Sequence, residues 1–166
     1  MKTKSIISIF AGLLLAIMIG ACQTQTGQQE KFETRWMGET LQEILEKIEG
    51  QFGGFSGTMV EVTYRYKELY WAGQDENWEY ALYQIEHIEE ALEQGFMRRP
   101  EREASAQQFV NQSLPEIEGF AKEGDKEAFL VSFTELAAAC NTCHNMEEVE
   151  FMVVDIPKVR TSVISF

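Results

Sequence analysis

The sequence predicts an all-α protein: an antiparallel four-helix bundle with an extra N-terminal helix and an irregular C-terminal tail. Apolar residues recur with the helical period of about 3.6 residues through most of the chain after residue 33. No stretch alternates apolar and polar residues strictly enough to indicate a sheet, and only three prolines interrupt the 166 residues. Short glycine-containing breaks separate the periodic segments, so successive helices should pack antiparallel within one domain.

The first 22 residues have the pattern of a bacterial lipoprotein signal. Two lysines precede an apolar run, residues 6–19, that is shorter than the ~20 residues of a membrane-spanning helix. Small residues and then Cys22 follow, as in a lipobox, whose cysteine is acylated after cleavage. An ordinary secretory signal followed by an incidental free cysteine is the alternative. The predicted organisation is a lipoprotein signal peptide at residues 1–21, a flexible tether at 22–33 and a folded domain at 34–166.

Cleavage of the signal leaves a strongly acidic chain. Residues 1–21 contain two lysines and no acidic residue, so cleavage changes the formal net charge from −13 to −15. Nucleic acid is excluded as a partner, because neutralising phosphates requires clustered Lys and Arg. An acidic surface favours a partner protein with a basic docking surface and fast, salt-sensitive encounters. Simple solubility is the alternative reason for this charge.

Glycines and capping residues mark the ends of the first three predicted helices. These helices occupy residues 34–49, 58–72 and 75–96. The first ends at Gly50, before a glycine-rich break at residues 51–57, and the second ends at Gly73. The third opens on cap candidates that include Asn77, and glutamates crowd the side opposite its apolar stripe. We interpret that acidic side as a solvated face.

Pro100, a favoured first helical residue, begins the fourth predicted helix. Pro115 should kink or split this helix, with Ser113 as a local cap. The fifth helix begins at Asp125, after Gly124. Its apolar stripe consists of Phe129, Phe133, Leu136, Cys140 and Cys143. The helical spacing of this stripe places both cysteines on the buried face. The residues after His144 should form an extended or irregular tail that is apolar enough to pack against another surface.

The segment CNTCH, residues 140–144, is the attachment signal for c-type haem. Two thiols about one helical turn apart can add to the two vinyl groups on one edge of the porphyrin. The next residue then brings its imidazole to the iron as the proximal ligand. We therefore expect one covalent haem c, held by Cys140 and Cys143 with His144 on the iron. Export agrees with this expectation, because bacterial haem ligation takes place outside the cytoplasmic membrane.

A redox dithiol, a zinc site and a plain disulfide compete with haem attachment as uses of CNTCH. A thioredoxin-like dithiol usually begins a helix after a strand, whereas these cysteines close a helix in a chain without predicted strands. A structural zinc site needs four ligands, and Cys140, Cys143 and His144 leave only His87 in reserve. A plain disulfide would leave His144 unexplained.

The ligand on the other side of the iron is predicted from the topology of the bundle. The last helix ends at the haem, so that end also holds Met59, early in the first bundle helix, and Met97, at a turn. His87 lies ten residues before Met97, which is about 15 Å along a helix, and is better explained as a surface or satisfied core residue. Met146 is too close to His144, and Met152 reaches the iron only if the tail folds over the haem. We expect Met59 to be the sixth ligand; the alternative is a core methionine and a five-coordinate iron.

Arg98 and Arg99 lie at the same end of the predicted bundle. Either of two roles is open for them: pairing with the haem propionates, or exposure to solvent as turn arginines.

With four predicted bundle helices ending in CNTCH, the sequence resembles the class II c-type cytochromes, the cytochrome c′ group and its low-spin relatives, over residues 58–144. The resemblance implies that the haem hangs from the last helix and that a residue early in the first bundle helix faces the iron. A methionine there implies a low-spin electron carrier, and a non-ligating residue implies a five-coordinate haem that binds small gases. Met59 lies at about that place.

The segment KELYWAGQDENWEYALYQIEHIEE, residues 67–90, together with CNTCH also looks like a group of exported bacterial proteins. They share Trp-Ala-Gly, Asn-Trp and a C-terminal Cys-Asn-x-Cys-His, and this second resemblance implies no activity.

Two features depart from the pattern of the class II c-type cytochromes. The chain continues through a tail after the histidine, and an extra helix at residues 34–49 precedes the bundle. The tail would shield the haem edge or form a docking surface, and the helix would act as a spacer from the membrane.

The combined expectation is a membrane-tethered monohaem c-type cytochrome that transfers electrons outside the cytoplasmic membrane. We expect a lipoprotein that faces the periplasm, in the outer membrane rather than the inner one, with a basic redox partner. No constellation of acid, base and nucleophile indicates an enzyme. The main alternative is a five-coordinate haem module that binds or senses nitric oxide or carbon monoxide. A third possibility is an accessory lipoprotein of a respiratory assembly, with the tail as its contact.

Overall fold

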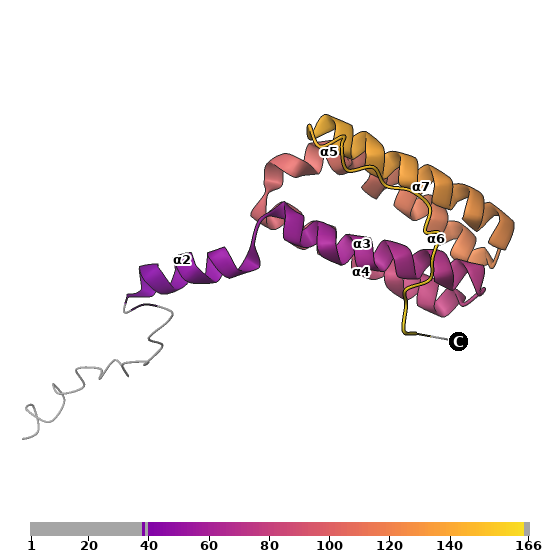
Figure 1. Cartoon of the computed structure of the whole chain (residues 1–166), viewed down its shortest axis with the longest axis horizontal. Helices are drawn as coiled ribbons and strands as arrows, with labels where there is room; N and C mark the ends of the chain where they lie inside the picture. The colour runs from indigo at the N-terminus through magenta and orange to yellow at the C-terminus, as the bar shows by residue number, and fades with distance from the viewer. Residues whose placement is uncertain (1–37, 39, 165–166) are drawn as a thin grey trace, which may run out of the picture. The chain divides into compact units, whose positions relative to one another are not determined.

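The computed structural model describes residues 38 and 40–164. Within this part the chain is all-helical, has no strand, and has four helical segments packed against one another (Figure 1). The α-helices are α2 (Leu41–Phe52), α3 (Phe55–Gln74), α4 (Trp78–Arg98), α5 (Glu103–Gln108), α6 (Leu114–Glu123) and α7 (Lys126–Met146). No helix among these residues has both the length and the apolar composition to cross a membrane. The expected signal peptide, Cys22 and the tether lie outside the described residues.

Helix α2 begins with a reciprocal cap and continues past the predicted end. The hydroxyl of Thr40 accepts from the Glu43 backbone N–H at 3.2 Å, and the Glu43 carboxylate accepts from the Thr40 N–H at 3.2 Å. The prediction that Gly50 ends this helix is wrong, because the helix tolerates Gly50 and continues to Phe52. Gly53 follows at φ +67°, a left-handed conformation that glycine adopts without strain. The chain divides into two units between Ile48 and Glu49.

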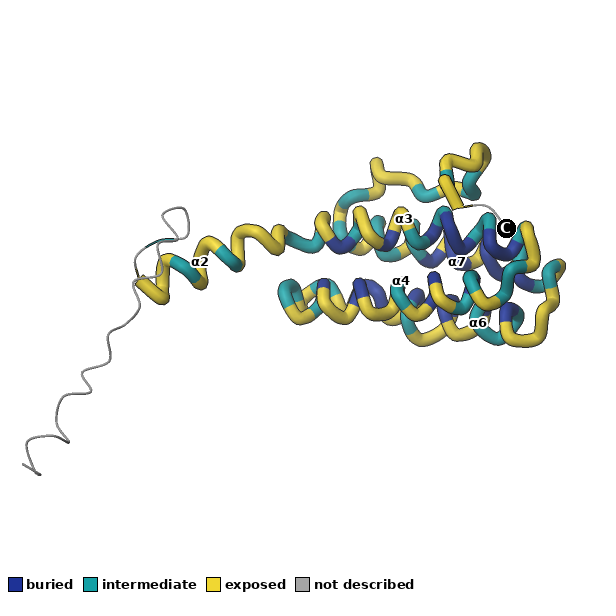
Figure 2. Tube along the Cα trace, turned by 90° about the horizontal axis from the view of Figure 1, so that it is seen from below, coloured by how far each residue is buried: buried dark blue, intermediate teal, exposed yellow. Residues whose placement is uncertain are grey.

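The bundle helices form a ring around one apolar core. Helix α3 contacts α4 and α7, and α6 also contacts α4 and α7. Figure 2 shows the buried residues along the inner sides of these helices. The largest fully buried apolar side chains are Phe129, Phe133, Leu69, Ile88, Ile117 and Leu136. Burial of these side chains supplies the main force that holds the four segments together.

The predicted cap at Asn77 is confirmed, and Asp125, the predicted start of the last helix, is also a cap. The Asn77 side chain accepts from the Tyr80 backbone N–H at 3.1 Å at the start of α4. The Asp125 side chain accepts from the Ala128 N–H at 3.0 Å at the start of α7. Each cap satisfies a backbone donor that the first turn of a helix leaves unpaired.

The sequence predicts that Pro115 kinks or splits the third segment of the bundle, and this segment consists of two α-helices, α5 and α6, on either side of a π-helical turn. Pro100 begins a short 3-10 turn, Pro100–Arg102, and α5 follows it. A π-helical turn, Phe109–Ser113, then joins α5 to α6. Pro115 has no N–H to donate to the preceding turn, and the wider π turn accommodates this loss without interrupting the segment. The prediction that Ser113 acts as a cap is wrong: its backbone is helical and its side chain makes no cap hydrogen bond.

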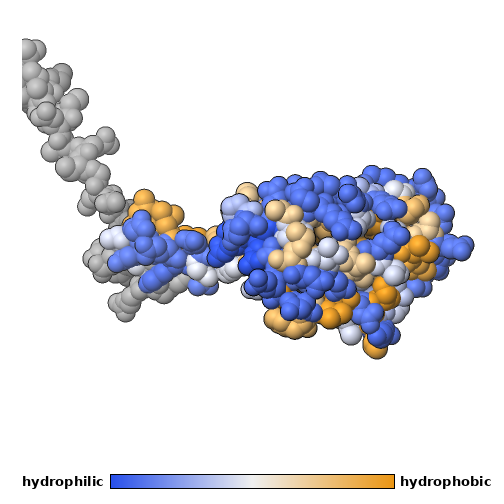
Figure 3. All heavy atoms as spheres, turned by 90° about the horizontal axis from the view of Figure 1, so that it is seen from above, coloured by the Kyte–Doolittle hydropathy of each residue, from blue (hydrophilic) through white to orange (hydrophobic). Residues whose placement is uncertain are grey.

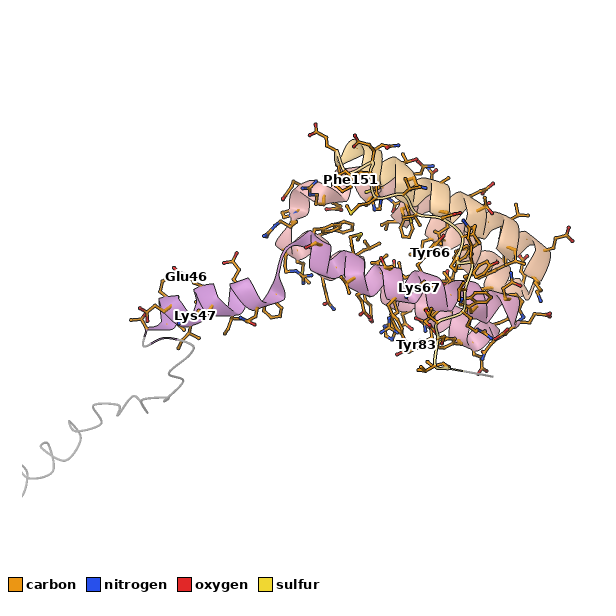
Figure 4. All side chains as sticks on the ribbon, in the orientation of Figure 1. Glu46, Lys47, Tyr66, Lys67, Tyr83 and Phe151 are labelled. Carbon is orange, nitrogen blue, oxygen red and sulfur yellow. The ribbon has the colours of Figure 1, made fainter. Side chains whose placement is uncertain are left out.

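The C-terminal tail packs along the bundle, and we call residues 149–162 the strap. It follows α7 and then crosses toward α3 (Figure 1). Val154 and Ile156 pack against the core. The Tyr66 hydroxyl donates to the Asp155 carbonyl at 3.2 Å, and Tyr66 is labelled between α3 and α7 in Figure 4. The Ser162 hydroxyl donates to the buried Glu68 carboxylate at 2.7 Å. The strap therefore covers the seam between the first and last bundle helices.

Gly73 provides the space that lets α3 and α7 approach each other. A Cβ built at Gly73 would lie 2.0 Å from Cε1 of Phe129, a fully buried ring. We expect Gly73→Ala to lower the free energy of unfolding by about 1–3 kcal/mol, because overpacking outweighs the roughly 1 kcal/mol gain in helix propensity. Gly119→Ala in α6 is the matched control. Apart from its two chain neighbours and the nearby backbone of α6, no described atom lies within 4 Å of a Cβ there, so this change should stabilise the protein by up to about 1 kcal/mol. Urea unfolding followed by circular dichroism measures both, and a Gly73→Ala variant as stable as the parent would contradict this packing.

Candidate functional site

One apolar cavity brings together the four predicted haem-site residues that the structure describes. Met59 of α3 and Cys140, Cys143 and His144 of α7 all line it. The cavity has a volume of about 260 Å³. Its other apolar walls include Phe55, Val62, Leu92 and Phe109. The start of α3 and the end of α7 lie together here because consecutive bundle segments alternate in direction.

The two cysteine thiols lie on the side of α7 that faces the cavity. Both are free, and the Cys143 Sγ lies 3.6 Å from the Ser105 hydroxyl of α5. Burial, and next the neighbouring Cys143, raise the pKa of the Cys140 thiol to about 12. Reactive dithiols need the opposite, a lowered pKa, which is typical of a helix N-terminus rather than of the end of a helix. The site therefore disfavours a thioredoxin-like dithiol.

The His144 imidazole is held by a backbone group of the strap. Its Nδ1 lies 2.6 Å from the Met152 carbonyl oxygen. A carbonyl can only accept, so Nδ1 carries a proton, and in the neutral ring Nε2 then has a free lone pair. Imidazoles that bind metals usually donate their other ring N–H to such a group, which fixes the tautomer and the ring orientation. Nothing in the spacing of CNTCH indicated this contact, because its acceptor lies eight residues further along the chain.

The structure separates the candidate sixth ligands that the topology placed at one end. Met59 is half-buried and lines the cavity. Met97 and Met146 are 77% and 61% exposed. The tail does fold over the site, and Met152 lines the cavity. However, the Met152 carbonyl binds the His144 ring, so Met152 lies on the same side of the site as His144. Met59 is therefore the methionine in the cavity that comes from the facing helix.

His87 lies away from this cavity, in a polar groove on α3 and α4. Its Nδ1 is 2.6 Å from a Glu90 carboxylate oxygen, and its ring lies edge-on against Tyr83. The expectation of a satisfied histidine is confirmed. His87 is therefore not available as the fourth ligand of a zinc site built from CNTCH. Among the described residues, no group of three or more His, Cys, Asp or Glu side chains is arranged to hold a metal ion.

The arginine that lines the cavity is Arg102, which the sequence did not single out. Arg102 pairs with the carboxylate of Glu147, at the end of α7. Arg98 instead donates to the Thr58 hydroxyl at 2.8 Å and lines the polar groove. Arg99 donates to the Arg98 carbonyl at 2.7 Å. The 3-10 turn after Arg99 carries the chain one turn further before α5 begins, and this brings Arg102 to the site.

No family model matches this chain, and no curated protein and no solved structure matches it. An assignment of function therefore depends on the chemistry of the site alone. The cavity offers two thiols three residues apart, an imidazole with a free Nε2, a thioether on the facing helix and an arginine at its margin. This set can hold a flat apolar group covalently at one edge and bind an iron from one or both sides.

The raised pKa of Cys140 predicts slow alkylation of its thiol. In a Cys143→Ser variant that begins at Gln23, Cys140 is the only cysteine, and burial, the larger cause of the shift, remains. Because the pKa is raised from 9.0 to about 12, the thiolate is scarce at pH 8 and increases only as the pH approaches 12. Iodoacetamide should react at least about tenfold more slowly than with an ordinary exposed cysteine, because less of the Cys140 thiol is ionised. The control places a cysteine at the exposed neighbouring position by Thr142→Cys, with Cys140 and Cys143 changed to serine. Equal rates for the two thiols, measured by mass spectrometry, would contradict the buried site.

Proposed function

We propose that this protein is a monohaem c-type cytochrome that transfers electrons outside the cytoplasmic membrane. The observation that carries the proposal is the meeting of CNTCH and Met59 at one apolar cavity. Cys140 and Cys143 would form the thioether bonds, His144 would be the proximal ligand and Met59 the sixth ligand. A bound haem would supply the one-electron chemistry of its iron.

The residues around the cavity fit a haem in three respects. The walls of the cavity beside the two thiols are mostly apolar, as in sites that bind apolar cofactors. The His144 ring is held with Nε2 free for an iron ligand bond. Arg102 lines the cavity and would pair with a propionate, sharing its charge with Glu147.

Ligation by methionine and histidine would suit an electron carrier. Such ligation raises the reduction potential of haem iron. Both ligands would come from bundle helices, α3 and α7, whose packing is fixed by fully buried aromatic side chains such as Phe129 and Phe133. A rigid pair of ligands limits rearrangement when the oxidation state of the iron changes. We propose electron transfer rather than substrate turnover on this basis.

The proposed partner is a redox protein with a basic docking surface. The mature chain is strongly acidic, which favours long-range attraction to a basic surface. After His144, exposed apolar side chains follow acidic ones in the sequence: Phe151 and Val153 are 77% and 74% exposed and come shortly after Glu148 and Glu150. Figure 4 labels Phe151 at the end of the bundle where α5 lies. Figure 3 shows apolar patches among hydrophilic residues on one face of the bundle.

Lipidation of Cys22 would keep this cytochrome at the membrane, facing the periplasm. A single acylated residue with several chains anchors a protein stably. We place the anchor in the outer membrane rather than the inner one, as the sequence predicts. The anchor and tether lie outside the described residues, so this part of the proposal depends on the sequence pattern alone.

Optical spectra test the proposed ligands directly. The protein would be produced in a host that matures c-type haem, and spectra recorded for the ferric and ferrous forms, with and without carbon monoxide. We expect a low-spin spectrum with a sulfur-to-iron band that Met59→Ala abolishes, and no binding of carbon monoxide by the parent. Met97→Ala is the matched control, since this exposed methionine should leave the spectrum unchanged. A high-spin ferrous parent that binds carbon monoxide would contradict Met59 as a ligand and favour the gas-binding module.

A further inference from the structure

We propose that the strap is a positioning element for the proximal histidine, and that Asn141, inside the CNTCH motif, sets its register. This inference depends on the proposed function, because it concerns the orientation of a haem ligand. Thioether attachment requires only the two cysteines and the histidine of the motif, and leaves the residues between the cysteines unassigned. The structure gives the first of these, Asn141, a defined set of contacts.

Asn141 binds the strap through both ends of its side-chain amide. Its Nδ2 donates to the Val154 carbonyl at 2.9 Å, and its Oδ1 accepts from the Val154 N–H at 2.8 Å. These paired bonds imitate those that a neighbouring strand would make with an extended segment. They satisfy both backbone groups of one residue and so fix where the strap lies along α7.

The same position of the strap also places a hydrogen-bond acceptor beside the His144 ring. Met152 lies two residues before Val154, at a bend of the strap. Pairing Val154 with Asn141 therefore holds the Met152 carbonyl beside α7. That carbonyl accepts from the His144 Nδ1 at 2.6 Å. Asn141 and His144 lie three residues apart, on neighbouring positions of the same helix.

Further contacts hold the strap in this position from its other side. Val154 packs against the core, and the adjoining Asp155 carbonyl accepts from the Tyr66 hydroxyl at 3.2 Å. Ile156 also packs against the core. The Met152 carbonyl is therefore a fixed acceptor rather than a chance neighbour. A carbonyl held in this way makes the imidazole a more basic iron ligand, which favours the ferric state and lowers the reduction potential.

The first test needs no haem. Isotope-labelled mature chain, produced without haem, reports two quantities by nuclear magnetic resonance: exchange of the Val154 amide, and the tautomer of the neutral His144 ring. Asn141→Ala should speed exchange of the Val154 amide by about tenfold, because that amide loses its acceptor. The ring should change from the Nδ1–H form to the Nε2–H form that free imidazole side chains prefer.

Two further variants distinguish the loss of the strap contact from general damage to the fold. Thr142→Ala changes the neighbouring motif residue, whose hydroxyl bonds only within α7, and should leave both quantities unchanged. A chain that ends at Glu150 removes the Met152 carbonyl itself and should show the same change of tautomer as Asn141→Ala. Unchanged exchange of the Val154 amide in Asn141→Ala, or a retained Nδ1–H ring in both altered chains, would overturn the proposal.

The second test uses the haem-loaded protein. Asn141→Ala should keep the covalent haem and show a higher reduction potential than the parent, while Thr142→Ala keeps the parental value. Equal potentials for these two variants would overturn the positioning role. If the parent takes up no haem at all, the proposed function fails. The exchange and tautomer measurements then still decide whether the strap orients His144.

Discussion

The packing of α7 against α3 is the interaction on which the rest of the structure depends. The Phe129 ring lies where a side chain at position 73 would otherwise be, and the Phe133 ring centroid lies 4.6 Å from that of Tyr66. These contacts fix the rotation of α7 about its own axis. Since α7 is one rigid helix, that rotation also decides where residues about two and three turns further on must face. The thiols and the imidazole therefore line the cavity as a consequence of how the aromatic core packs.

The strap extends the same arrangement along the bundle. At one end it contacts His144 and Asn141, and at the other it contacts the residues around the turn between α3 and α4. There the Arg160 guanidinium lies 5.2 Å from the Trp71 ring centroid and pairs with Asp75. The strap crosses the seam between the first and last bundle helices, which have the longest separation in sequence. Of the strap residues, Val149 and Met152 line the cavity in which the proposed haem would lie.

Much of the fold is predictable from the sequence because its determinants are local. Helical period and cap chemistry operate within a few residues, so the starts of α4 and α7 follow from Asn77 and Asp125. The composite third segment was less predictable. Pro115 indicated a disturbance, but whether a helix breaks, kinks or widens into a π turn depends on the packing around it.

Part of the candidate site is likewise predictable from the sequence, and part is not. Cys140, Cys143 and His144 form a contiguous motif, and helix direction placed Met59 near them. Topology alone could not separate Met59 from Met97, because both lie at one end and only the direction of the side chain distinguishes them. Arg102 and the Met152 carbonyl reach the site through a 3-10 turn and an irregular tail. Neither element has a periodicity from which contacts can be predicted.

The most direct test of the central claim is the intact mass of the mature protein, produced in a host that matures c-type haem. We expect the mass of the chain plus one haem that survives denaturation and acid extraction. Changing both Cys140 and Cys143 to alanine should abolish this addition, whereas Met59→Ala should retain it, because Met59 forms no covalent bond. A parent protein that carries no covalent haem in a host that loads other c-type cytochromes would contradict the account.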